Sequence, residues 1–169
     1  IDEMLPRPSG LPDPPALGSV APPMPSPRVL VTRPSLVLAV ADSVLFAVWT
    51  KVAGRPEDLL ACLPLALQQA KALKQCGLVV ALHPEQPLPD GPFRDVIKTE
   101  MRKLDPYLLC GATVLLRGGL LGTAMRAVVS TLQLLSRTTH PERIVASGTE
   151  AARFVHDVLV RQLDKAPSE

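Results

Sequence analysis

Two apolar runs separated by a short polar pair open the patterned part of the chain. The runs SLVLAVA (35–41) and VLFAVWT (44–50) are apolar at almost every position, as expected for strands that are covered on at least one face. Between them stands Asp42-Ser43, a pair of turn-forming residues. Two β-rich runs joined by a two-residue turn predict a β-hairpin.

Beyond the hairpin, segments with helical spacing alternate with short, continuously apolar segments. Periodicity and capping residues predict helices at 55–76, 93–104, 120–136 and 148–163. Continuous apolar runs predict buried strands at 78–82, 108–116 and 143–146. Pro64 lies inside the first helical pattern, so we expect that helix to be kinked or split there.

The order of these elements predicts an α/β fold. Strands that are joined through helices run parallel, with right-handed crossovers, whereas the initial hairpin adds an antiparallel pair. The sequence therefore predicts a five-stranded mixed sheet covered by four helices, in the order β-β-α-β-α-β-α-β-α.

The first 34 residues differ in composition from the rest of the chain. They contain ten of the 19 prolines, and proline has a fixed φ and no backbone donor. This composition predicts a proline-rich arm over 1–34, extended or disordered, before a folded domain over 35–165. Two roles stay open for the arm, a flexible tail or a docking segment that lies on a partner or on its own domain.

The overall composition narrows the class of protein. With 47% hydrophobic but only 3% aromatic residues, the core is expected to consist of Leu, Val and Ala. A net charge of +2, with the basic residues scattered, argues against nucleic-acid binding. The three cysteines (Cys62, Cys76 and Cys110) form no CxxC pair, which favours a reducing cytoplasm and argues against a metal site. The apolar run 120–135 is interrupted by polar residues and is too short to span a bilayer.

The histidines give little indication of catalysis. His83 and Glu85 could form a base with its orienting carboxylate at the end of a strand, but the prolines around them favour a solvated loop. His140 and His156 are expected to be surface histidines or histidines with satisfied hydrogen bonds.

One glycine turn could hold an anion. Arg117-Gly118-Gly119 precedes a helix, where backbone amides can cradle a phosphate, but it matches neither of the glycine-rich nucleotide-binding patterns. The simpler interpretation is that the glycines let the strand turn into the helix. We therefore predict a protein that is not an enzyme and that needs no cofactor.

Three features of the second half of the chain occur together. They are the turn GLLG at 119–122, Arg126 in the helix that follows, and the strand entry PERIV at 141–145. With the order of elements, they resemble the STAS domains of anti-sigma factor antagonists, and more closely the divergent STAS-like proteins of myxobacteria and related soil bacteria. The resemblance covers about residues 35–163.

The resemblance implies a function in protein binding. STAS proteins bind protein partners and commonly switch partners when a Ser or Thr is phosphorylated at the start of the helix after the third strand. Here the equivalent stretch, 83–92, contains Asp90 and Gly91 but no Ser or Thr. The implied function is a non-enzymatic regulatory module of the bacterial cytoplasm that binds a protein without this phosphorylation switch.

The surface expected to bind the partner comprises the 84–92 loop, the second helix and the exposed edge of the long helix at 120–136. The residues assigned to it are Asp90, Gly91, Arg94, Lys98, Arg117, Gly118, Gly119 and Arg126. Because the long helix is apolar around much of its circumference, two alternatives stay open. One is a homodimer through this helix, and the other is a small-ligand or lipid site in the groove between the helix and the sheet.

Overall fold

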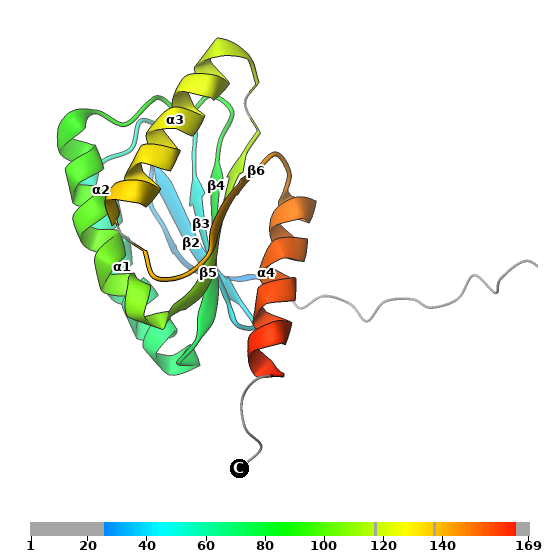
Figure 1. The fold of residues 1–169 in the computed structure, drawn as a ribbon. Coiled ribbons are helices and arrows are strands. Elements are labelled where there is room, and N and C mark those ends of the chain that lie inside the picture. The colour runs from blue at the N-terminus through cyan, green and yellow to red at the C-terminus, as the bar shows by residue number, and fades with distance from the viewer. Residues whose placement is uncertain (1–25, 117, 137, 165–169) are drawn as a thin grey trace, which may run out of the picture.

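The structure, a computed structural model, describes residues 26–116, 118–136 and 138–164. Most of the expected proline-rich arm, residues 1–25, lies outside the described residues. The described chain forms one twisted sheet with helices on both of its faces (Figure 1).

Six strands form this sheet and lie in it in sequence order. They are β1 (Arg28–Thr32), β2 (Leu36–Ala41), β3 (Val44–Trp49), β4 (Cys76–Leu82), β5 (Leu108–Leu115) and β6 (Glu142–Val145). β1, β2 and β3 pair antiparallel, whereas β3 to β6 pair parallel. The α/β class and the mixed sheet are confirmed, but the expected number of strands is wrong, because the sheet has six strands rather than five.

The additional strand, β1, comes from the segment that composition assigned to the arm. Between Pro27 and Pro34 the chain carries the proline-free sequence RVLVT, whose valines favour extended backbone. β1 pairs with β2 at the edge of the sheet, with a register shift between Val29 and Val31. Such irregularities are common on edge strands. The high proline content of residues 1–34 as a whole predicts no strand, although the five residues 28–32 follow the strand pattern.

The hairpin of β2 and β3 is confirmed. Its two strands pair from Leu36 with Trp49 to Ala41 with Val44, so Asp42 and Ser43 form the turn. Asp42 has a φ of 47°, a left-handed conformation that aspartate tolerates in tight turns.

The four expected helices are present, and they divide between the two faces of the sheet. They are α1 (Pro56–Leu73), α2 (Gly91–Leu104), α3 (Gly119–Ser136) and α4 (Gly148–Leu163). α1, α2 and α3 connect neighbouring parallel strands and lie side by side on one face (Figure 1). Successive crossovers of one handedness that step in one direction place their helices on one face. α4 follows the last strand and packs on the opposite face, against β4, β5 and β6.

α1 is one continuous helix through Pro64, so the expected split at this residue is wrong. The interior proline removes one helical hydrogen bond. Leu63 and Ala66 on either side of it are buried against the sheet, and such packing supplies most of the stability of helices in proteins. Tertiary contacts therefore outweigh the local preference.

Candidate ligand-binding site

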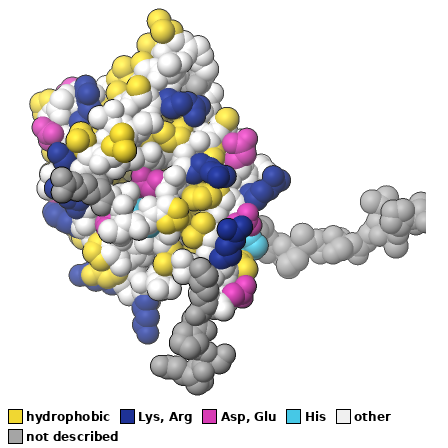
Figure 2. Space-filling view, in the orientation of Figure 1, with side chains coloured by type: hydrophobic (Ala, Val, Ile, Leu, Met, Phe, Trp, Pro, Cys, Tyr) yellow, Lys and Arg dark blue, Asp and Glu magenta, His cyan; other side chains and the backbone are white. Residues whose placement is uncertain are grey.

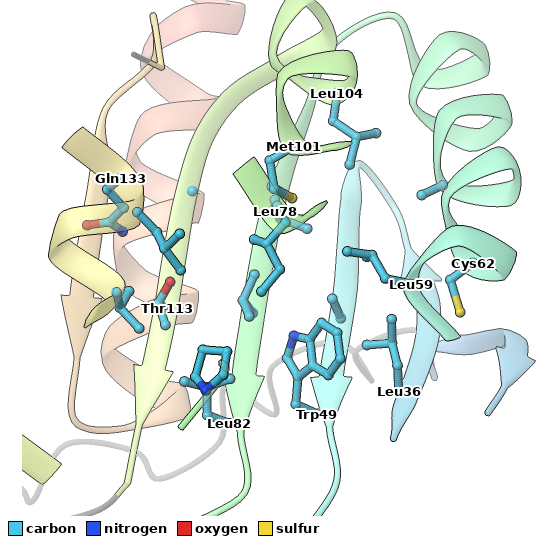
Figure 3. A pocket seen from close by; sticks show the side chains of 18 of the residues that line it. Leu36, Trp49, Leu59, Cys62, Leu78, Leu82, Met101, Leu104, Thr113 and Gln133 are labelled. Atoms are coloured by element: carbon cyan, nitrogen blue, oxygen red, sulfur yellow. The ribbon is translucent and has the colours of Figure 1, made fainter. Parts of the chain in front are cut away.

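A cavity of about 170 Å³ lies between the sheet and the layer formed by α1, α2 and α3. Strands β2 to β6 all contribute side chains to its lining. In Figure 3, Thr113 and Gln133 lie toward one end, and Trp49, Leu59 and Cys62 lie toward the other. We call this cavity the chamber.

The chamber exists because β5 presents small side chains beneath α3. In the register of β4 and β5, Leu78 lies beside Gly111 and Val80 lies beside Thr113. Large aliphatic side chains on β4 thus lie beside a glycine and a threonine on β5. Because side chains at alternate positions share one face of a strand, these small residues lie under α3 and leave space below it.

The composition of α3 fits a helix that roofs a cavity. Of its apolar side chains that the structure describes, Met125 alone is fully buried. Val128, Val129 and Leu132 are half-buried and line the chamber. A helix with this apolar content normally packs closely on a sheet, whereas here the lower face of α3 borders the chamber.

Aromatic and loop residues close one end of the chamber. The rings of Trp49 and Phe93 meet edge to face, with centroids 5.5 Å apart. The buried side chain of Gln86 ties the loop before α2 to the chain after β3. With its amide nitrogen facing the carbonyls, it donates to Thr50 O and to Val52 O at 3.1 Å and accepts from Gly54 N at 3.2 Å. A Cβ on Gly54 would overlap the Phe93 ring, which explains glycine at this position.

A buried carboxylate fixes α1 near the same end. Oδ2 of Asp58 accepts hydrogen bonds from Ser35 N at 3.0 Å and from Ser35 Oγ at 2.6 Å. Burial alone would raise the pKa of Asp58, but these hydrogen bonds, with help from Arg55 and Arg33, hold the pKa below its ordinary value. The start of β2 is thereby locked to the first turn of α1.

The other end of the chamber is polar. Its lining includes Thr113, Gln133, Thr138 and Glu142. Beside it lies His140, whose side chain is 4% exposed. Nδ1 of His140 lies 2.8 Å from Oδ1 of Asp105, and Nε2 lies 3.3 Å from Oε1 of Glu142. These contacts lie at ion-pair distance but lack hydrogen-bond geometry, so both ring nitrogens remain without a directed partner among the described residues.

The group of Asp105, His140 and Glu142 was missed by sequence reasoning. The expectation that His140 is a surface or hydrogen-bonded histidine is wrong, because its ring is buried between two carboxylates. Glu142 is two residues from His140 and was a visible signal. Asp105 is distant in the chain and reaches the group through its carboxylate, which accepts from Thr139 N and Thr139 Oγ1, both at 3.1 Å.

This group resembles the histidine–carboxylate pair of many enzymes in one respect only. In a catalytic pair, one imidazole nitrogen is oriented by a carboxylate and the other faces a nucleophile. Here the second nitrogen faces another carboxylate, that of Glu142. The described residues contain no set of three side chains that could hold a metal ion. The arrangement thus offers hydrogen-bond acceptors rather than a nucleophile.

The cysteines are buried thiols without a disulfide. Burial raises the pKa of Cys76 and of Cys110 to about 11, and it also raises the pKa of Cys62. Because the thiolate is the reactive form, these side chains behave as small apolar core residues at neutral pH.

The residues assigned to partner binding separate into three groups. Asp90 caps α2, its carboxylate accepting from Phe93 N at 2.8 Å. The side chains of Arg94 and Lys98 on α2 border a surface groove together with Gly91. The others are on or before α3: Gly118, Gly119 and Arg126 are exposed, and Arg117 lies outside the described residues.

The groove between α2 and α3 has a volume of about 350 Å³. Its α3 side is formed by Ala127, Val128, Thr131, Leu132 and Leu135. The structure thus brings the predicted α2 residues next to α3, but Arg126 is not among the residues that line the groove. On the face shown in Figure 2, basic side chains are scattered between hydrophobic ones.

The pair of His83 and Glu85 forms a loop turn. Nδ1 of His83 accepts a hydrogen bond from the backbone N–H of Glu85 at 3.1 Å, and His83 N donates to Trp49 O at 3.0 Å. The imidazole thus supports the loop through a backbone group.

Comparison of the chain with protein-family models, with curated proteins and with solved structures returned no match. The STAS resemblance therefore stays a prediction that rests on the residues quoted for it. Within the described ranges, no helix is both long enough and apolar enough to cross a membrane.

Proposed function

We propose that this domain binds a linear apolar molecule, such as an alkyl or acyl chain, in the chamber beneath α3. The observation that carries the proposal is a cavity of about 170 Å³, partly open to the surface, with a mainly aliphatic lining. An engineered apolar cavity of about 150 Å³ in another protein stays dry and binds benzene. A cavity of this size lowers stability when it is empty, and a bound apolar group offsets that cost.

The outline of the chamber favours a chain over a compact ring system. Its lining extends from Leu36 on β2 to Glu142 on β6, which are four strand spacings apart. At about 4.8 Å for each spacing, the residues that line the chamber span about 19 Å of the sheet. A lining that is elongated across the strands suits an extended alkyl chain.

The proposed function is binding without catalysis. It is supported by His140, both of whose ring nitrogens face carboxylates rather than a nucleophile. The three unpaired, buried cysteines support a reducing compartment such as the bacterial cytoplasm as the place where the protein acts.

The test uses Trp49, the only tryptophan of the chain, which lines the chamber. Titration with decan-1-ol is expected to change its fluorescence in a saturable way. Thr113→Leu enlarges a side chain on the chamber floor and is expected to weaken binding at least about tenfold. Val48→Leu is the matched control, because Val48 on β3 is exposed to solvent. Equal binding by both variants, or no saturable signal from the unaltered protein, would contradict the proposal.

A second candidate function is protein binding at the groove between α2 and α3, as the STAS resemblance implies. It is favoured by Leu135 of α3, which lines the groove and is 49% exposed, since exposed apolar side chains commonly mark interaction sites. Arg94 and Lys98, set against one acidic residue, Asp95, give the groove a net positive charge and favour an amphipathic partner segment with acidic side chains. This interaction would be the regulatory function of the module.

The second candidate function predicts that charge reversal on this face prevents binding of the partner. Arg94→Glu combined with Lys98→Glu, which reverses the two basic side chains of the groove, is expected to abolish capture of a defined partner from lysate of the source cell. Thr113→Leu is the control, since its side chain is in the chamber rather than on the groove. Retention of the same partner by the charge-reversed protein would exclude this surface.

A further inference from the structure

We propose that the chamber selects amphiphiles whose head group donates hydrogen bonds, a hydroxyl or an ammonium group, and rejects carboxylate head groups. This inference rests on the proposed ligand-binding function. It specifies at which end of the chamber the head group of the ligand lies and which protein groups recognise it.

An unpartnered carboxylate oxygen marks the position of the head group. Oε2 of Glu142 is buried, and no donor among the described residues reaches it. Glu142 lines the polar end of the chamber. Buried acceptors in folded proteins are almost always hydrogen-bonded, and leaving one unpaired is unfavourable. A donor on a molecule at this end of the chamber would satisfy this oxygen once the carboxylate turns toward it.

The charges around this oxygen disfavour an anionic head group. Asp105 and Glu142 each contribute a carboxylate, and His140 between them contributes at most one positive charge. The group therefore carries a net charge of −1 or −2 when both carboxylates are ionised. A ligand carboxylate placed beside Glu142 would be repelled by it, and burial strengthens that repulsion.

Cationic side chains in this part of the described structure have other partners. Arg102 donates to Leu135 O at 3.1 Å, and Lys103 pairs with Glu100 at 2.7 Å. The guanidinium of Arg143 lies 5.0 Å from the centroid of the Phe154 ring, which belongs to α4 on the opposite face. These contacts direct the three cations away from Glu142.

Helix ends add to the negative potential. α2 ends at Leu104, next to Asp105, and α3 ends at Ser136, close in sequence to Thr138 at the polar end of the chamber. The last carbonyls of a helix carry partial negative charge. Both helices therefore favour a donor or a cation at this end.

Space for a head group is provided by Gly111. A Cβ built on Gly111 would lie 3.4 Å from Cγ of Glu142 and 3.5 Å from Nε2 of His140. The missing side chain thus leaves a space of about one methyl group beside the carboxylate and the imidazole. The hydroxyls of Thr113 and Thr138 line the same end and can accept a second hydrogen bond from the head group.

The test compares decan-1-ol, decylamine and decanoate, three probes with one chain length and different head groups, by titration of Trp49 fluorescence at pH 7. The alcohol, the amine or both are expected to bind at least about tenfold more tightly than decanoate. Glu142→Gln removes the charge while keeping the shape of the side chain, and it is expected to reduce this preference to about threefold or less. Glu85→Gln, a carboxylate in the exposed loop before α2, is the matched control and is expected to keep it.

The outcomes separate the head-group inference from the proposed function. Tighter binding of decylamine than of decan-1-ol, lost in Glu142→Gln, assigns an ammonium group, and equal binding of the two assigns a neutral donor. Decanoate binding as tightly as the other probes, or a preference unchanged in Glu142→Gln, would overturn the inference and leave the ligand-binding function standing. Absence of binding by all three probes would overturn both.

Discussion

Replacement of Thr113 by leucine is expected to stabilise the protein while it weakens ligand binding. Thr113 is 8% exposed and lies on the floor of the chamber. Leucine has one more heavy atom than threonine and no hydroxyl, so it fills part of the empty space beneath α3. An ordinary core position would give the opposite result, because enlarging a side chain in a closely packed core is destabilising.

The size of the effect follows from two terms. An additional buried methylene contributes about 0.8 kcal/mol, and replacement of a hydroxyl that borders the mainly apolar chamber by an apolar group contributes about 1 kcal/mol. Loss of the β-branched side chain from a strand offsets these gains by up to about 0.5 kcal/mol. The free energy of unfolding should therefore rise by about 1–2 kcal/mol. At an unfolding entropy of about 2.1 cal/mol/K per residue, this raises the Tm of a domain of about 140 residues by about 3–7 °C.

Two measurements on the same variant check this reasoning. Urea unfolding gives the change in stability, and titration with decan-1-ol gives the change in affinity. The expected signature is higher stability with weaker binding, and Val48→Leu should change neither by a comparable amount. If Thr113→Leu lowered the free energy of unfolding by about 1 kcal/mol or more, the space beneath α3 would be filled in the native protein and the chamber would be refuted as a binding site.

Two further predictions concern the groups that hold the fold. Asp58→Asn should lower stability at pH 7 by about 1.5–3 kcal/mol, because the hydrogen bonds from Ser35 to a charged acceptor are weakened. Since folding lowers the pKa of Asp58 from its ordinary 3.8, its contribution is present above that value and is lost as the pH falls through the folded pKa. Urea midpoints between pH 6 and pH 2 should therefore fall less steeply in Asp58→Asn than in the unaltered protein, and identical slopes would contradict this account. Iodoacetamide at pH 8 should leave the native cysteines unmodified and alkylate them in urea, because burial raises the pKa of Cys76 and Cys110 to about 11. Fast modification of the native protein, followed by mass spectrometry, would show that these thiols are accessible.

The candidate site was only partly predictable from the sequence. The α2 side of the groove was predicted, since Arg94 and Lys98 belong to the polar stripe of an amphipathic helix, and helical spacing alone places such a stripe outside. The groove between α3 and the sheet was predicted as an alternative site, because the helix is too apolar for a single buried face. The sequence did not predict that two carboxylates lie beside His140, because Asp105 follows α2 and reaches the start of β6 only through the packing of the sheet.

What the sequence alone determined about this protein was local in origin. The hairpin turn at Asp42, the N-cap at Ser147, whose hydroxyl accepts from Glu150 N, and the order of helices and strands each follow from a few neighbouring residues. Such signals act through φ preferences, side-chain hydrogen bonds to the backbone and hydrophobic periodicity. The residues that produce each signal all lie within one turn or one strand.

Contacts between distant segments decided the rest. β1 is a strand because β2 offers it an edge, and α1 stays continuous through Pro64 because its neighbours are buried. The chamber depends on the register that places Gly111 and Thr113 beside the larger residues of β4 and beneath α3. A cavity is the volume that side chains from several elements leave unfilled, so no single stretch of the sequence specifies it.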